Sequence, residues 1–282
     1  MTFFSFPKQL PSLAALTLVL CQCGASAQAQ PSGLPLWEVG GFAGSLSTPA
    51  YPASAERLNR NLVLPYFIYR GERLSVDRDG IDARLRLASD YELDLGVSGS
   101  FPASSNDIAV RQGMPDLGTL LEFGPRLKVK LPSPGPGLRL GLDLPLREVF
   151  EVSGGTRGQG LVFEPTLALD MDNVGGGWSL TAKFGLTWGD QQINQYFYGV
   201  APAYATALRP AFEAQSGLMS ARASLGASKS LNPDVRVFGY ARMDYFGLSS
   251  NTASPLHLQN SSPSLGLGLT WTLGRSEARV GE

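Results

Sequence analysis

Thiols and imidazoles are scarce in this chain, which contains two cysteines and one histidine. Both cysteines, Cys21 and Cys23, lie in an N-terminal segment that we expect to be removed from the mature protein. Without them, disulfides, thiolate metal sites and cysteine nucleophiles are excluded. A single histidine also argues against zinc, which proteins hold with several nitrogen and sulfur ligands. We therefore expect neither a metal nor another cofactor.

Sustained helical periodicity is missing from the chain after its N-terminal segment. In that segment, the apolar residues 13–20 follow Lys8 and precede Ala25-Ser26-Ala27, which is the pattern of a secretory signal with its cleavage site. The apolar run is too short to cross a bilayer as a helix. We therefore predict a signal peptide over residues 1–27 and one domain over residues 28–282, with cleavage after Ala29 as the close alternative.

Neither sign of charge is in excess, since 23 basic and 24 acidic residues give a net charge of −1. Proteins that bind nucleic acid gain much of their affinity from an excess of positive charge. We therefore expect no nucleic-acid partner. The 33 glycines and the aromatic content of 10% instead fit a β-rich membrane protein.

Alternation of apolar and polar residues with a period of two is the main pattern that is present. Segments of about ten residues with this pattern are typical of membrane barrels, whose strands turn one face to lipid and the other to a wet lumen. We therefore expect outer-membrane lipid to cover the apolar face. In the clearest segment, residues 91–101, the apolar face is Tyr91, Leu93, Leu95, Val97 and Phe101, and the polar face is Glu92, Asp94, Gly96, Ser98 and Ser100.

Connection lengths give a second argument for a barrel. Outer-membrane barrels have short turns in the periplasm and long loops outside. From residue 91 onward, short turn signals at 132–137, 173–177 and 231–234 alternate with long connections at 102–118, 151–160, 189–216 and 247–262. The connection at 47–60 is also long, and the alternation extends to it only if residues 72–77 supply an additional strand. The predicted strands lie at about 36–46, 61–70, 72–77, 81–88, 91–101, 119–131, 138–150, 161–171, 178–188, 217–229, 235–246 and 263–273.

The sequence thus predicts an all-β fold, a transmembrane antiparallel β-barrel in the cell outer membrane. An even number of strands, twelve, places the N- and C-termini in the periplasm. A ten-stranded barrel is the alternative, if residues 72–88 form one outer excursion or fold.

Charged residues of both signs fall on the positions that should face the lumen. Opposite charges can pair and fill a narrow barrel, because an unpaired buried charge is costly. They can also line a selective pore. The mixed signs favour the filled barrel over the pore. The main candidates are Lys128, Lys130, Arg139, Arg147, Asp94 and Glu122.

Two further patterns have simple interpretations. His257 lies near Ser254, but nothing at fixed spacing completes a hydrolase triad, so we predict a solvated loop histidine and no catalytic activity.

The segment Asp77-Arg78-Asp79-Gly80 could bind calcium, yet Asp-Gly within an alternating run is a strong hairpin signal, so we predict a turn.

The long connection 189–216 is rich in aromatic residues, with Tyr196, Phe197, Tyr198 and Tyr204 close together. Exposed apolar surface of this kind usually covers a barrel mouth or contacts a partner. The sequence leaves both interpretations open.

Several motifs together resemble the MltA-interacting protein (MipA)/OmpV family of outer-membrane proteins. The resemblance runs through nearly the whole mature chain, with alanine in place of a family glycine at Ala53. The motifs are Leu36-Trp37-Glu38-Val39-Gly40, Leu64-Pro65-Tyr66-Phe67-Ile68-Tyr69-Arg70-Gly71, Asp77-Arg78-Asp79-Gly80, Gly113-Met114-Pro115-Asp116-Leu117, Tyr196-Phe197-Tyr198-Gly199-Val200, Tyr204-Ala205-Thr206 and Arg209-Pro210-Ala211-Phe212.

This resemblance implies a non-enzymatic outer-membrane protein, a scaffold between a lytic transglycosylase and a peptidoglycan synthase. A porin-like channel for small solutes, or a surface adhesin that uses the long external loops, is the alternative.

Overall fold

The computed structural model describes residues 33–71, 74–77, 80–83, 85–86 and 90–279. Within them the chain is mostly β-structure, with one α-helix, α1 (Gln191–Tyr198), and the 3-10 helices η1 (Ser105–Asp107), η2 (Ala109–Arg111) and η3 (Pro202–Tyr204). The signal peptide predicted over residues 1–27 lies outside the described residues. The strands are β1 (Trp37–Pro49), β2 (Arg57–Arg70), β3 (Leu74–Asp77), β4 (Gly80–Ala83), β5 (Leu85–Arg86), β6 (Tyr91–Ser100), β7 (Leu120–Leu131), β8 (Leu138–Glu151), β9 (Arg157–Phe163), β10 (Thr166–Val174), β11 (Trp178–Gly189), β12 (Gly217–Ser230), β13 (Val235–Tyr245) and β14 (Ser261–Arg275).

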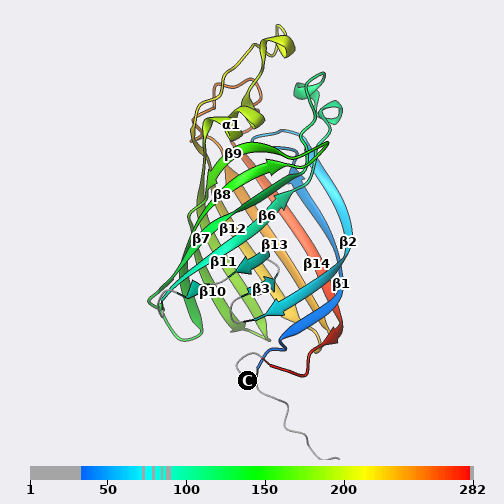
Figure 1. Cartoon of the computed structure of the whole chain (residues 1–282), viewed down its shortest axis with the longest axis vertical. Coiled ribbons are helices and arrows are strands. Elements are labelled where there is room, and N and C mark those ends of the chain that lie inside the picture. The colour runs from blue at the N-terminus through cyan, green and yellow to red at the C-terminus, as the bar shows by residue number, and fades with distance from the viewer. Residues whose placement is uncertain (1–32, 72–73, 78–79, 84, 87–89, 280–282) are drawn as a thin grey trace, which may run out of the picture. The chain divides into compact units, whose positions relative to one another are not determined.

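The described strands form one 14-stranded antiparallel sheet in which most strands pair with their neighbours in the chain, except that β8 pairs with both β9 and β10 and that β4 and β5 are the two ends of the hydrogen-bonded order. β1 also pairs with β14, so the first and last of these strands lie side by side. In the order of hydrogen-bonded strands across the sheet, β4 lies at one end and β6 lies next to the other end. These two strands are also in contact with each other. Figure 1 shows how the strands consequently curve around a common axis. The predicted antiparallel, all-β fold is confirmed.

The strand predicted at 161–171 is interrupted in the structure. β9 ends at Phe163 and β10 begins at Thr166, with Glu164 and Pro165 between them. Pro165 has no backbone N–H and cannot donate to the ladder. Because β9 and β10 both pair with β8 and with β11, they share one place in the sheet. β9 also begins earlier than predicted, at Arg157, which shortens the connection before it.

The Asp-Gly hairpin is also present. β3 pairs with β4, with Asp77 opposite Gly80, while Arg78 and Asp79 lie outside the described residues. β2 pairs with β3, and β5 pairs with β6. This part of the chain therefore belongs to the sheet.

The outward face of the sheet is apolar and exposed. On β14, Leu267 is 72% exposed and Leu273 is 70% exposed, and Phe184 of β11 is 55% exposed. Positions between them carry small or polar residues, such as Gly266 and Gly268 of β14, and point to the other side of the sheet. The alternation read from the sequence thus separates two faces in space.

Short and long connections lie at opposite ends of the strands (Figure 1). The short turns at 132–137, 175–177 and 231–234 are at the end where β1 begins and β14 finishes. We call the long connections at the other end, residues 50–56, 101–119, 190–216 and 246–260, the cap.

The cap contains a helix that the sequence analysis did not anticipate. α1 has only 8 residues, too few for a sustained periodic pattern, and the Asp190 side chain caps it by accepting a hydrogen bond from the Ile193 N–H at 3.0 Å. No helix among the described residues has the length and apolar character needed to cross a membrane.

Candidate functional site

A row of ion pairs crosses the inner face of the sheet. Arg147 of β8 lies 2.9 Å from Glu122 of β7 (Nε to Oε2) and 2.5 Å from Glu164 (Nη2 to Oε2). Glu164 also contacts Arg222 of β12, whose Nε lies 2.7 Å from Asp244 Oδ1. Cations and carboxylates alternate, so the row neutralises itself. Its members, called the belt below, are Glu122, Arg147, Glu164, Arg222, Asp244 and Arg242.

A second cluster lies beside the belt, on β6 and β7. Asp94 has a side chain that is 0% exposed and accepts two hydrogen bonds from Arg126, each of 2.9 Å. Lys128 Nζ lies 2.7 Å from the same carboxylate and 3.9 Å from Glu92. One buried carboxylate therefore pairs with two cations. Its loss would remove negative charge that offsets the positive charges of both.

A cavity of about 900 Å³ lies between these ion pairs and the short-turn end. Its wall comes from β6, β7, β8, β10, β11, β12 and β13. Lys130 and the 62%-exposed side chain of Arg139 line it near the short turns, so the cavity opens toward that end.

The structure brings the six predicted lumen charges to this region. Lys128, Lys130, Arg139 and Arg147 line the cavity, while Asp94 and Glu122 hold wall residues through ion pairs. Arg139 pairs with Asp172, which the sequence analysis did not single out. Among the described residues, no group of histidine, cysteine and acidic side chains could hold a metal ion.

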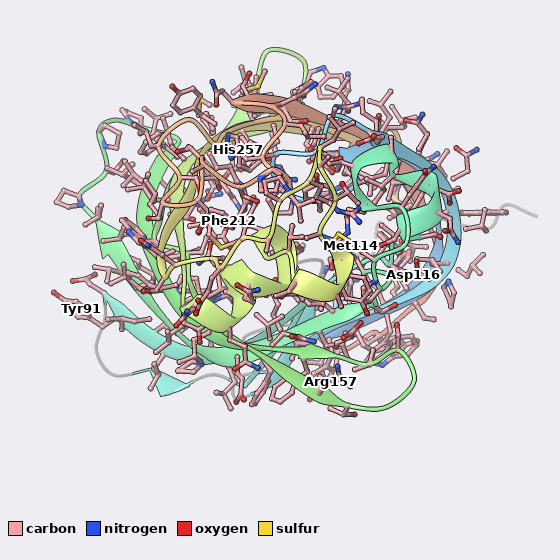
Figure 2. The ribbon with its side chains drawn as sticks, turned by 90° about the horizontal axis from the view of Figure 1, so that it is seen from above. Tyr91, Met114, Asp116, Arg157, Phe212 and His257 are labelled. Carbon is pink, nitrogen blue, oxygen red and sulfur yellow. The ribbon has the colours of Figure 1, made fainter. Side chains whose placement is uncertain are left out.

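The aromatic residues of the cap point into it. Tyr198 is 0% exposed, and Tyr196 and Phe197 pack against both apolar clusters of the cap. Tyr204 packs against the cluster that contains Tyr51, Ile108, Val200 and Leu256. Figure 2, seen from the cap end, shows Phe212 and His257 over the space that the strands surround. The cap thus forms a packed layer across that end of the sheet.

Two buried arginines tie separate cap segments together, and the sequence analysis missed their role. Arg209 is 7% exposed and donates to the carbonyls of Val110 (2.6 Å) and Gln112 (3.1 Å). Arg111 is 3% exposed and donates to the Phe197 carbonyl at 3.4 Å. The only sequence signal for Arg209 was its place in the motif Arg209-Pro210-Ala211-Phe212.

A buried amide pair makes a similar connection. Asn251 Nδ2 donates to Asn194 Oδ1 of α1 at 2.9 Å, and its Oδ1 accepts from the Gln215 N–H at 2.8 Å. Both asparagines are 0% exposed. Because buried amides without partners are costly, this pair favours one position of α1 over the sheet.

His257 is half-buried against Tyr198, with ring centroids 6.3 Å apart, rather than solvated as predicted. Its Nε2 lies 3.1 Å from Asn260 Oδ1, while the Ser254 hydroxyl donates to the Tyr198 carbonyl at 2.6 Å. His257 and Ser254 therefore have different partners and do not form a nucleophile–base pair.

Tyr196 joins the cap to the end of β8. Its hydroxyl accepts from the Gly118 N–H at 2.8 Å and donates to Glu151 Oε1 at 3.4 Å. Burial raises the pKa of the Tyr196 phenol from 10.0 to about 12, and the Glu151 carboxylate acts in the same direction. Burial also raises the pKa values of Tyr51 and Tyr198.

We expect the cap to lose stability as pH rises from 10 to about 12. In this range an unfolded tyrosine ionises while the folded Tyr196 keeps its proton, so its contribution is complete below pH 10 and declines above it. Proteolysis of the cap against pH should show a weaker dependence in Tyr196→Phe, whereas Tyr91→Phe, at the exposed start of β6, should behave as wild type. An unchanged profile in Tyr196→Phe would contradict this assignment.

Solved structures with a similar strand arrangement include outer-membrane proteins. An outer membrane channel from Pseudomonas putida F1 has 16% identity and a TM-score of 0.47, covering 85% of this chain and 97% of its own. The NanC porin has 10% identity and a TM-score of 0.42, covering 82% and 100%. Outer membrane phospholipase A from Escherichia coli has 12% identity and a TM-score of 0.33, covering 85% and 94%.

No curated protein sequence matches the chain. The sequence profile described as MltA-interacting protein MipA matches residues 41–273, which run from β1 into β14 and include the cavity wall and the cap. The chain therefore belongs to the MltA-interacting protein MipA family.

Proposed function

We propose that the sheet closes into a twelve-stranded barrel in the outer membrane, after removal of residues 1–27. Counting β4 with β5 and β9 with β10 as single interrupted strands gives this number, and β3 and β4 have hydrogen-bonded places in the sheet, unlike in the ten-stranded alternative. The exposed apolar outward face supports contact with lipid. The short turns and both ends of the barrel domain then face the periplasm.

The function that this geometry supports best is docking of a peptidoglycan-remodelling enzyme at the periplasmic end. The observation that carries the proposal is the packed cap, because it covers the opposite end and leaves the cavity and its surrounding turns accessible. The family description refers to interaction with MltA. We propose a lytic transglycosylase of this kind as the partner, together with a peptidoglycan synthase, and no catalytic activity for the barrel itself.

The docking surface in this proposal consists of the turns 132–137, 173–177 and 231–234. A standard interface covers roughly 800 Å² on each partner, more than one short turn offers, so the turns must act together. Leu231, which is 59% exposed, provides an apolar contact at this end.

Replacing Leu231 with aspartate should reduce recovery of the transglycosylase from crosslinked cell envelopes several-fold, because it puts a charge into the proposed contact. Leu208→Asp is the matched control, since Leu208 is 95% exposed but lies in the cap. If wild-type protein recovers no peptidoglycan enzyme, docking is wrong. If Leu208→Asp or Tyr204→Ala abolishes attachment to surfaces, the adhesin alternative takes its place.

A porin-like channel for small solutes remains the second candidate, favoured by the cavity of about 900 Å³. It requires a path through the cap and past the belt. Stable conductance of the purified protein in planar bilayers would promote this function over docking.

A further inference from the structure

The cavity wall contains a hollow of small residues between a carboxylate and an ammonium group. Asp143 of β8 lies on one side of the hollow, and Lys183 of β11 lies on the other, with β10 between them. The floor of the hollow consists of Gly141, Thr166, Ala168 and Gly185, which are neighbours in the register of the three strands. Larger side chains at these four positions would fill the space.

Asp143 and Lys183 differ from the members of the belt and of the Asp94 cluster. Within the described part of the chain, neither Asp143 nor Lys183 takes part in an ion pair, whereas the belt and the Asp94 cluster are internally compensated. Lys128 is opposite Asp143 in the strand register, but its Nζ lies 2.7 Å from Asp94. Lys183 is exposed to the cavity. Asp170 of β10 is a further carboxylate in the wall, and it accepts a hydrogen bond from the Thr181 hydroxyl at 2.6 Å. Outside the two clusters, the wall therefore offers carboxylates and the Lys183 ammonium group to a molecule in the cavity.

Spacing restricts the size of that molecule. Two strand spacings separate β8 from β11, so the backbones that carry the two groups are about 10 Å apart. An extended tripeptide, whose ends are roughly 7–10 Å apart, is long enough to lie across β10 from one group to the other. The Tyr240 hydroxyl, also in the wall, adds a donor and acceptor for a peptide group.

We propose that this hollow binds a short zwitterionic peptide, free or attached to a sugar, with its ammonium group at Asp143 and a carboxylate at Lys183. The site is inside the barrel, so it does not depend on the docking of a partner protein at the turns. Charge-assisted hydrogen bonds at both ends provide the selectivity, because a solute with one charge leaves the other wall group without a partner.

The test is calorimetric titration of the purified full-length protein in detergent, without any partner, with trialanine as the probe. Lys183→Met and Asp143→Asn should each weaken binding about ten-fold or more, as expected for one charge-assisted contact. Lys229→Met is the matched control, because Lys229 lies over the Trp178 ring outside the cavity and should bind as wild type. N-acetyl-trialanine amide, which has no end charges, should not bind.

A soluble disaccharide–tetrapeptide fragment of peptidoglycan distinguishes the two sources of such a peptide. Tighter binding of the fragment than of trialanine indicates the sugar-linked form, and equal binding indicates the free peptide. No binding of either probe, or undiminished binding in both Lys183→Met and Asp143→Asn, would overturn the proposal. Heat-modifiable migration on gels shows that each variant is folded, and failure of this test leaves the docking proposal unaffected.

Discussion

Replacing residues 191–212 with a short Gly-Ser linker is expected to turn a poorly conducting protein into one with stable ion conductance in a planar bilayer. This segment contains α1 and the aromatic residues that fill the cap, including Tyr198, which is 0% exposed. Its removal takes away the apolar layer over the strand ends. The belt that remains is charged and can hydrate, so it should conduct ions with modest selectivity.

The matched control replaces only Ala207 and Leu208 with glycine. Leu208 is 95% exposed, so this change shortens side chains without opening the packed layer, and conductance should stay low. If removal of residues 191–212 leaves conductance unchanged, the belt rather than the cap is the barrier. If the intact protein already conducts stably, the cap does not close the barrel and the porin function is favoured.

A second large effect is expected from Asp94→Asn, which should destabilise the protein by about 3–5 kcal/mol. The substitution removes a carboxylate with a side chain that is 0% exposed and leaves Arg126 and Lys128 close together. The midpoint of urea unfolding, followed by the loss of heat-modifiable migration, measures the change.

Asp172→Asn is the control for this change, since it also breaks an aspartate–arginine pair. The side chains of Asp172 and Arg139 are 47% and 62% exposed, and exposed pairs contribute about 0–1 kcal/mol. Equal effects of the two substitutions would show that burial of Asp94 is not what makes its pairs important.

The sheet could be predicted from the sequence because its signal is local. A period of two in residues 91–101 or 178–188 separates outward from inward residues whatever the neighbouring strands are. The break at Pro165 was also visible in principle, because proline cannot donate to a ladder. The pairing of the inward charges, in contrast, could not be predicted from a local pattern. Glu164 and Arg222 contact each other across β11, and this contact depends on the curvature of the sheet.

The cap was less accessible to sequence reasoning. Aromatic residues in the connection 189–216 indicated a covering or a partner surface, but could not distinguish them. Hydrogen bonds between residues distant in the sequence hold this segment in the covering position. Arg209 donates to the carbonyls of Val110 and Gln112, and Asn251 donates to Asn194. Local patterns carry no information about contacts between loops that meet only after the sheet has formed.

The pairing of β1 with β14 sets an order on assembly. Glu38 is opposite Arg275, and Ser47 is opposite Leu265, so the second edge of β1 stays open until the C-terminal part of the chain has arrived. Open edges invite pairing with other chains. A nascent chain that stalls before β14 therefore exposes unsatisfied edges on β1 and β13, and this species is the one most exposed to pairing with other chains.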